Sequence, residues 1–265
     1  MKTKRFQTLI LGLTILSIVA CQPKSPEIKT EVAVVATDSI VKPEEKKSSE
    51  DTAKAVELDT IYGFDVSHFQ GKVDWATIKK SGKHFGIAKA TQGITYTDPE
   101  FQTNWSEIEG NGMYRGAYHF YVAKDDPIKQ AEHFVNTVKD MGAHHLPPAL
   151  DLEGQSIEGL TVEAYQEGVM KWLNYVEEKL GIKPMIYTNH PFGNQYLNND
   201  QFSTYQLWIA EYGSEEAKIP EAWTNKSWTG WQFTEHDKTE GLNGSVDESR
   251  FLSSILLNSK ESESK

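Results

Sequence analysis

The sequence contains a single cysteine, Cys21, and far fewer basic than acidic residues. One cysteine excludes an internal disulfide, and its position near the N-terminus excludes cysteine nucleophile chemistry in the folded part of the chain. Lys and Arg number 27 against 38 Asp and Glu, which gives a net charge of −11. This balance lacks the basic footprint of a nucleic-acid-binding protein, so we expect no nucleic-acid partner.

Several common catalytic motifs are missing as well. The chain has no Gly-x-Ser-x-Gly nucleophile elbow, no phosphate-binding P-loop and no His-x-x-x-His spacing that would place two metal ligands on one helix. Carboxylate clusters suit Mg²⁺ or Ca²⁺, but nothing in the histidine spacing supports a site. We therefore expect neither a catalytic metal nor a cofactor.

A basic and then apolar leader opens the chain. Lys2, Lys4 and Arg5 precede an apolar run from residue 9 to residue 20. This run is too short to span a bilayer comfortably and has the form of a secretory signal. The small residues before Cys21 resemble a bacterial lipobox, which implies cleavage before Cys21 and lipidation of its thiol and new amino group. An ordinary signal peptide with an incidental cysteine is the alternative.

These features divide the chain into four expected parts. Residues 1–20 are a lipoprotein signal peptide, and residues 21–60 are the lipidated cysteine and a disordered tether rich in Lys, Glu, Ser, Pro and Thr. Residues 61–257 form the globular domain, and residues 258–265 a polar tail. We expect an exported, monomeric bacterial lipoprotein, anchored to the outer membrane or displayed at the cell surface, with the membrane side left open.

From residue 61 onward, short apolar runs alternate with helical patterns. Strands are expected at residues 62–67, 85–91, 114–122, 146–153, 183–188, 205–212, 227–233 and 245–251. The first five belong to βα units, and the last three lack clear helices between them. Because strands that alternate with helices form parallel sheets, the prediction is an α/β fold with a closed, irregular barrel related to the (β/α)8 fold.

Four acidic residues fall at or near strand ends of this barrel. Asp65 belongs to the first strand, Asp151 and Glu153 to the fourth, and Asp247 to the last. Side chains alternate along a strand, so Asp151 and Glu153 share one face and cannot both ionise cheaply in a partly dry site. A protonated acid beside a carboxylate suits cleavage of a glycosidic bond. We expect the four acids to meet in one cleft; ordinary solvated strand ends are the alternative.

A series of short motifs follows these strands in a fixed order. The motifs are Gly63-Phe64-Asp65-Val66-Ser67-His68-Phe69-Gln70-Gly71, Lys89-Ala90-Thr91-Gln92-Gly93, Tyr118-His119-Phe120, Leu146-Pro147-Pro148-Ala149-Leu150-Asp151-Leu152-Glu153, Trp208-Ile209-Ala210, Trp231-Gln232-Phe233 and Val246-Asp247. Together they resemble the lysozymes of glycoside hydrolase family 25. The resemblance covers residues 61–257 and implies an irregular TIM-like (β/α)5(β)3 barrel.

The resemblance also implies an N-acetylmuramidase, a lysozyme that cuts the β-1,4 bond between N-acetylmuramic acid and N-acetylglucosamine in peptidoglycan. Glu153 matches the general acid, and Asp151 would stay ionised and stabilise the substrate's own N-acetyl group as that group attacks the anomeric carbon. Asp65 and Asp247 would hold sugar hydroxyls and tune the pKa of Glu153. A carboxylate nucleophile or an inverting route through water stays open.

Aromatic residues late in the strands are candidates for sugar subsites, because their faces stack on pyranose rings. The candidate substrate-binding residues are Tyr118, Phe120, Tyr187, Trp208, Tyr212, Trp231 and Gln232. A place in the core is the alternative for each aromatic residue, and His119 is expected to be structural. The family usually has Glu where this chain has Gln92, which leaves substrate preference and pH optimum open.

Two other functions remain possible at this point. The barrel could bind cell-wall glycan without turnover, although the complete set of four acids argues against a decayed enzyme. It could also cleave another N-acetylated polymer such as chitin. Remodelling of the cell's own wall and attack on other cells are equally compatible with the sequence.

Overall fold

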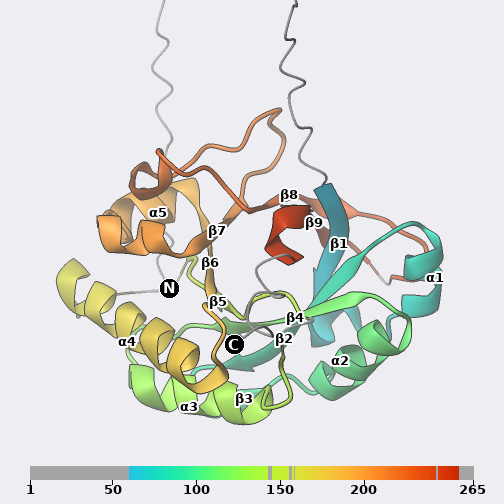
Figure 1. Cartoon of the computed structure of the whole chain (residues 1–265), viewed down its shortest axis with the longest axis horizontal. Helices are drawn as coiled ribbons and strands as arrows, with labels where there is room; N and C mark the ends of the chain where they lie inside the picture. The colour runs from blue at the N-terminus through green and yellow to red at the C-terminus, as the bar shows by residue number, and fades with distance from the viewer. Residues whose placement is uncertain (1–59, 143–144, 155–156, 158, 243, 257–265) are drawn as a thin grey trace, which may run out of the picture. The chain divides into compact units, whose positions relative to one another are not determined.

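Strands and helices alternate from Thr60 onward in the computed structural model, which describes residues 60–142, 145–154, 157, 159–242 and 244–256 (Figure 1). The predicted signal peptide, Cys21, the predicted tether up to residue 59 and the predicted tail lie outside these residues. The strands are β1 (Thr60–Val66), β2 (Phe85–Gln92), β3 (Tyr96–Thr97), β4 (Tyr114–Phe120), β5 (Ala149–Asp151), β6 (Met185–Asn189), β7 (Gln206–Ala210), β8 (Gly230–Asp237) and β9 (Val246–Leu252).

Helices follow each of the first five barrel strands, as predicted. They are α1 (Trp75–Lys80), α2 (Phe101–Gly110), α3 (Pro127–Thr137), α4 (Val162–Leu180) and α5 (His190–Tyr196). The longest, α4, begins where the Thr161 hydroxyl accepts the backbone N–H of Ala164 and ends at Gly181 in the left-handed conformation. The later connections carry only short 3-10 turns: η2 (Asp200–Thr204), η3 (Glu221–Trp223) and η4 (Ser253–Leu256), while η1 (His68–Gln70) follows β1.

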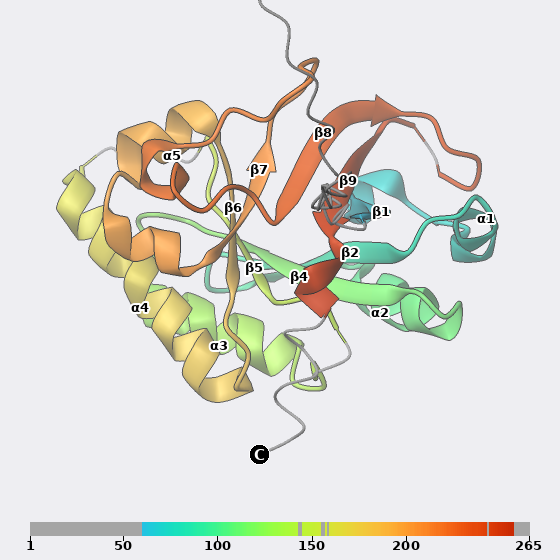
Figure 2. The ribbon, with the colours of Figure 1, turned by 45° about the horizontal axis from the view of Figure 1, so that its top comes forward.

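The strands close into an eight-stranded barrel in the order β1-β2-β4-β5-β6-β7-β8-β9 and back to β1 (Figures 1 and 2). Neighbours run parallel except for β9, which is antiparallel to both β1 and β8. The short strand β3 pairs only with β2 and lies outside the ring. The predicted α/β fold, an irregular TIM-like (β/α)5(β)3 barrel, is confirmed.

Strand β5 is shorter than the stretch predicted for it. Pro147 and Pro148 lack the backbone N–H that a strand ladder needs, so regular pairing begins only at Ala149. The strand ends at Asp151, and Glu153 follows two residues later in the same alternation. Both carboxylates therefore leave the sheet at its C-terminal edge.

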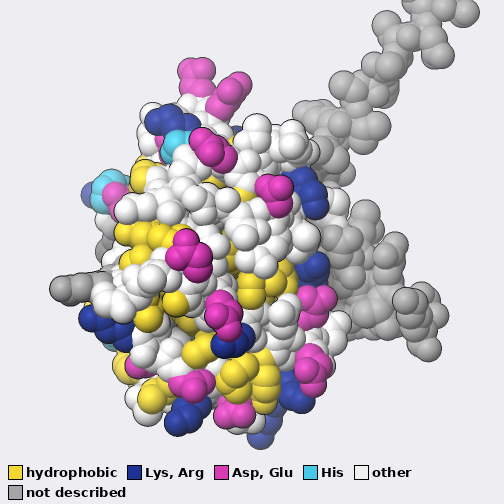
Figure 3. Space-filling model, turned by 90° about the vertical axis from the view of Figure 1, so that its left-hand side faces the viewer, with side chains coloured by type: hydrophobic (Ala, Val, Ile, Leu, Met, Phe, Trp, Pro, Cys, Tyr) yellow, Lys and Arg dark blue, Asp and Glu magenta, His cyan; other side chains and the backbone are white. Residues whose placement is uncertain are grey.

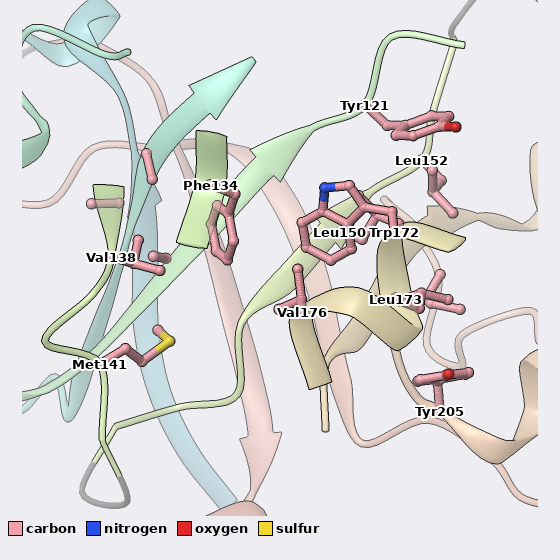
Figure 4. Packing of buried hydrophobic residues seen from close by; sticks show 14 of the residues in the cluster. Tyr121, Phe134, Val138, Met141, Leu150, Leu152, Trp172, Leu173, Val176 and Tyr205 are labelled. Atoms are coloured by element: carbon pink, nitrogen blue, oxygen red, sulfur yellow. The ribbon is translucent and has the colours of Figure 1, made fainter. Parts of the chain in front are cut away.

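Apolar residues fill both faces of the barrel wall. An outer cluster lies between the strands and the helices, and Figure 4 shows Leu150 and Leu152 there, on the same side of the strands as Trp172 and Val176 of α4. An inner cluster fills the barrel and includes Ile61, Phe85, Ile87, Leu146, Ala149, Met185, Tyr187, Trp208, Ala210, Phe251 and Ile255. Each fully buried large side chain stabilises the fold by about 1.5–3 kcal/mol. With Leu150 and Leu152 outside, Asp151 faces the interior.

The end of the barrel at which the parallel strands begin is closed by η4, which Figure 1 shows inside the ring of strands. Ile255 of this turn is buried in the inner cluster together with Ile61 of β1. The opposite end, where the parallel strands finish, stays available for polar groups. On the outer face seen in Figure 3, charged side chains of both signs are interspersed with apolar patches.

Gly63 in β1 marks the closest approach of two barrel strands. A Cβ atom at this position would lie 2.2 Å from the carbonyl oxygen of Phe85, far inside van der Waals contact. We expect Gly63→Ala to lower the free energy of unfolding by about 3 kcal/mol, since neither backbone can move freely in a closed barrel. Urea denaturation measures this loss.

Gly110 at the end of α2 is the matched control. A Cβ atom there meets nothing within 4 Å, so Gly110→Ala should be neutral or stabilise by about 0.5 kcal/mol. Equal stability of both variants would contradict the steric argument for Gly63.

Candidate active site

The structure brings the four predicted acids together at the C-terminal mouth of the barrel. Asp65 lies near the end of β1, Asp151 ends β5, and Glu153 follows it. Asp247 lies near the start of β9, and because β9 is antiparallel, that start reaches the same mouth and pairs Asp247 directly with Asp65. One cavity is lined by all four acids together with Tyr118, Tyr187, Trp208 and Gln232.

This cavity is small, with a volume of about 70 Å³, roughly twice one water molecule's share of the liquid. It accommodates one small substituent of a sugar rather than a whole ring, so a glycan would lie across its opening. A larger groove of about 650 Å³ lies elsewhere, beside Asp74, Trp75 and Gly241, and none of the four acids lines it. The smaller cavity is therefore the candidate active site.

Burial dominates the electrostatics of the acids. It raises the pKa of Asp65 well above its ordinary range, and the neighbouring charge of Asp247 raises it further. Burial raises the pKa of Asp247 to about 6, with the charge of Glu235 as the next cause. Four carboxyl groups this close cannot all be ionised near neutral pH, so the site holds protons there.

Asp151 and Glu153 form the central pair of this cluster. Burial raises the pKa of both carboxyl groups, and the charge of Glu153 raises that of Asp151 further. The ammonium group of Lys89 favours negative charge on Asp151, and a hydrogen bond from Tyr187 would favour it on Glu153 if the hydroxyl turned to that carboxylate. The pair therefore shares protons, and the prediction that Asp151 is the ionised partner depends on Lys89.

Gln232 connects opposite sides of the cavity. Its Nε2 donates to Asp65 Oδ2 at 2.9 Å, and its Oε1 accepts the Tyr187 hydroxyl at 2.8 Å and also the Tyr212 hydroxyl. The Tyr187 oxygen lies 3.4 Å from Glu153 Oε2, so its hydrogen points to Gln232 rather than to Glu153. Because two hydroxyl donors need its oxygen, the orientation of this amide is fixed.

Most of the predicted subsite residues lie at the cavity or close to it. Tyr118, Tyr187 and Trp208 line the cavity, and Tyr212 reaches it through Gln232 while remaining 40% exposed. Phe120 shares the inner face of β4 with Tyr118, and its ring lies 5.0 Å from the Lys89 ammonium.

Trp231 is not brought to the site. Its indole is buried in the outer cluster, donates to the carbonyl oxygen of Glu211 at 2.7 Å and packs against Arg250. Strand alternation explains this: Gln232 points into the barrel, so its neighbour Trp231 must point out. By the same alternation, His119 points out of the barrel because its neighbour Tyr118 points inward.

His119 is structural, as expected. It is fully buried, its Nδ1 lies 2.7 Å from the Thr91 hydroxyl, and its Nε2 lies 3.2 Å from Gln130 Oε1. Burial lowers its pKa to about 3, so the ring is neutral under ordinary conditions and its two nitrogens serve these partners.

Lys89 is the functional candidate that sequence reasoning missed. It lies in β2 on the same face as Phe85 and Ile87 of the inner cluster and is only 8% exposed. The sequence does contain a signal. Phe85, Ile87 and Lys89 lie two residues apart along one strand, so the charged Lys89 should face the interior as the two apolar residues do. An inward lysine beside inward acids indicates a polar site at that level of the barrel.

Asp247 gives a test of these electrostatics through stability. Its pKa rises from 3.8 to about 6 on folding, so between about pH 4 and about pH 6 the folded state binds more protons than the unfolded state. Its contribution to stability is complete below that window and is lost as the pH rises through it. We expect Asp247→Asn to gain stability over the wild type at about pH 7 and little at about pH 4, as measured by urea midpoints. A difference that does not change with pH would contradict the raised pKa.

Among the residues that the structure describes, no group of three or more His, Cys, Asp or Glu side chains is arranged to hold a metal ion. None of the helices in this part of the chain is long and apolar enough to cross a membrane.

Buried acids at the mouth of a closed α/β barrel are an arrangement that suits glycoside hydrolysis. The model of glycosyl hydrolases family 25 matches residues 64–242, and the chain belongs to this family. The Escherichia coli (strain K12) protein named "Uncharacterized protein YegX" is 30% identical over 250 residues, which cover 92% of this chain and 89% of that protein.

The chain is also similar to proteins whose names state an activity. The autolytic lysozyme of Clostridium acetobutylicum is 33% identical over 198 residues, which cover 74% of this chain and 57% of that protein. The crystal structure of the bacterial lysozyme from Streptomyces coelicolor superposes with a TM-score of 0.70 at 26% identity, covering 75% of this chain and 98% of that one. The family match includes Asp65, Asp151 and Glu153 and ends before Asp247.

Proposed function

We propose that this protein is an N-acetylmuramidase that hydrolyses the β-1,4 bond between N-acetylmuramic acid and N-acetylglucosamine in peptidoglycan. The observation that carries the proposal is the cavity in which Asp151 and Glu153, both with raised pKa, face Asp65 and Asp247. Membership of the family and the similarity to named lysozymes support the choice of substrate.

In the proposed reaction Glu153 gives its proton to the glycosidic oxygen as the bond to the anomeric carbon breaks. The carbonyl oxygen of the substrate's N-acetyl group bonds to that carbon, and negative charge on Asp151 stabilises the positive charge that develops on the acetamido group. Water then attacks the anomeric carbon, its proton returns to Glu153, and the acetamido oxygen leaves. The small cavity suits the acetamido group.

The remaining residues would hold the sugar in this geometry. Asp65 and Asp247 can accept hydrogen bonds from sugar hydroxyls and, through their charges, keep a proton on Glu153. Tyr118, Tyr187 and Trp208 offer aromatic surface beside the acids.

Product analysis tests the reaction. The protein is incubated with peptidoglycan and, separately, with chitin oligomers, and new reducing ends are reduced with borohydride and identified by mass spectrometry. Reduced muramic acid from peptidoglycan alone supports a muramidase. Reduced glucosamine ends from chitin would favour the alternative glycosidase, and binding without new ends would favour a non-catalytic glycan-binding protein.

We also propose that the protein is exported and anchored to a membrane by lipid on Cys21. The support is the basic and apolar leader followed by small residues and the cysteine. Metabolic labelling with a radioactive fatty acid should mark the wild type and not Cys21→Ser. Equal labelling of both proteins would refute lipidation at this residue.

A further inference from the structure

Lys89 places a cation among the acids at the barrel mouth. Its neighbour across the sheet is Tyr118, which lines the cavity. The Lys89 ammonium donates to Gln92 Oε1 at 2.8 Å and lies 5.0 Å from the ring centre of Phe120 and 5.8 Å from that of Tyr96. Three side chains from β2, β3 and β4 therefore enclose it.

No carboxylate of the described residues contacts this ammonium group, although Asp151 and Asp98 interact with its charge over a longer distance. Within the described part of the chain, no Asp or Glu lies within ion-pair distance of Lys89, whereas Lys83, Lys171, Lys179 and Lys218 each have such a partner. The Asp98 carboxylate, at the end of the β2–β3 hairpin, already accepts from the backbone and ring of His68, with the ring nitrogen at 2.7 Å. The direct partner of Lys89, Gln92, is neutral.

Lys89 lies beside the acidic cavity without lining it, and it offers a positive charge that attracts an anion. Asp65, Asp151, Glu153 and Asp247 would repel a negative substituent from the cavity itself. Lys89 offers up to three N–H donors, and the carboxamide of Gln92 brings a further pair of N–H groups next to them. Partial burial strengthens a hydrogen bond between an ammonium and a carboxylate compared with one in open water.

We propose that the end of β2 forms a carboxylate-binding subsite, in which Lys89 and Gln92 bind a carboxylate carried by the peptidoglycan substrate. This inference rests on the proposed function and specifies a chemical group, a carboxylate, that the substrate carries. The carboxylate has two possible sources: the lactyl group of muramic acid in peptide-free glycan, where it is free, or the stem peptide in strands that still carry it.

Two substrate pairs separate these sources. The first pair is peptide-free glycan with its lactyl carboxylates free or converted to methylamides. The second pair is stem-bearing glycan with its peptide carboxylates free or converted to methylamides. We expect the wild type to show a KM about tenfold lower for the free acid in one pair, as one charge-assisted contact would give. The pair that responds identifies the source, and equal KM values within both pairs would overturn the proposal.

Variants connect the discrimination to Lys89. In Lys89→Met the KM ratio within the responding pair should fall to about one, and in Gln92→Glu it should shrink because an internal carboxylate then competes for the ammonium. Using ratios within one enzyme removes any general loss of activity that these changes cause. Lys171→Met, at an exposed ion pair on α4, is the control and should keep the wild-type ratio. Full discrimination in Lys89→Met would overturn the assignment.

Binding measurements keep this test separate from that of the proposed function. Calorimetry of the same four glycans with Glu153→Gln reports affinity without turnover. If no substrate yields muramic acid ends, the proposed function fails, and the affinities still decide the carboxylate subsite. If all four are cut and bound alike, only the subsite fails.

Discussion

Glu153→Gln is expected to lose at least ~10²-fold in turnover of peptidoglycan while keeping its fold, because an amide cannot donate the proton that the leaving oxygen needs. Glu153 is partly exposed at the edge of the cavity and carries only a weak contact with Tyr187. The change replaces a carboxyl group by an amide of nearly the same size and adds no heavy atom, so the thermal midpoint should change little. Initial rates with soluble peptidoglycan fragments and a thermal scan measure the two effects.

The leaving group provides an internal control for this prediction. A substrate with an acidic aryl leaving group needs little protonation, so the loss in Glu153→Gln should be much smaller with such a substrate. Glu163→Gln, at the exposed start of α4, makes the same chemical change away from the site and should leave turnover unaltered. Near wild-type turnover of peptidoglycan by Glu153→Gln would refute the assignment of the general acid.

Gln232→Met is expected to reduce both activity and stability. Methionine has a similar volume, but it leaves Asp65 and Tyr187 without the partner they have at 2.9 and 2.8 Å. Each buried group that loses its partner costs about 1–3 kcal/mol, so we expect about 2–6 kcal/mol less stability in urea denaturation. Gln201→Met, at an exposed position in η2, should change stability by less than about 0.5 kcal/mol.

The pH profile distinguishes this effect from simple loss of packing. Once Gln232 is gone, the Tyr187 hydroxyl is free to turn toward Glu153, and a hydrogen bond from it lowers the pKa of that carboxyl group. Glu153 would then lose its proton at lower pH, so the alkaline limb of the rate profile should move to lower pH. An unchanged limb in a folded variant would show that Gln232 does not control the proton on Glu153.

Most of the fold was predictable because the domain is built from regular periods. Alternating strands and helices indicated a parallel barrel, and period 2 within Leu150-Asp151-Leu152-Glu153 indicated which side chains face inward. The antiparallel direction of β9 was not predictable from periodicity, because a strand has the same pattern in either direction. The direction of β9 is shown by the structure, in which Asp247 pairs with Asp65.

The site was predictable for acids and less so for aromatic residues. An acid within an apolar strand is unusual enough to indicate a site, whereas an aromatic residue fits either face of the barrel wall. Trp208 faces the cavity and Trp231 belongs to the outer cluster, although both lie in barrel strands. Lys89 was not predicted, because a lysine is usually exposed and is rarely buried. The Lys89 ammonium contacts Gln92, three residues further along β2, and the pairing of β2 with β4 shifts register between these two residues.

The reversed last strand also decides how the domain can be attached to a support. β9 runs from the acidic mouth back to the opposite end, where Leu252 pairs with Thr60, the first residue of β1. The polypeptide therefore enters and leaves the barrel at the same pole, and the catalytic opening is at the other. A linker, fusion partner or resin joined at either boundary of the domain would hold it by its base and leave the opening directed outward.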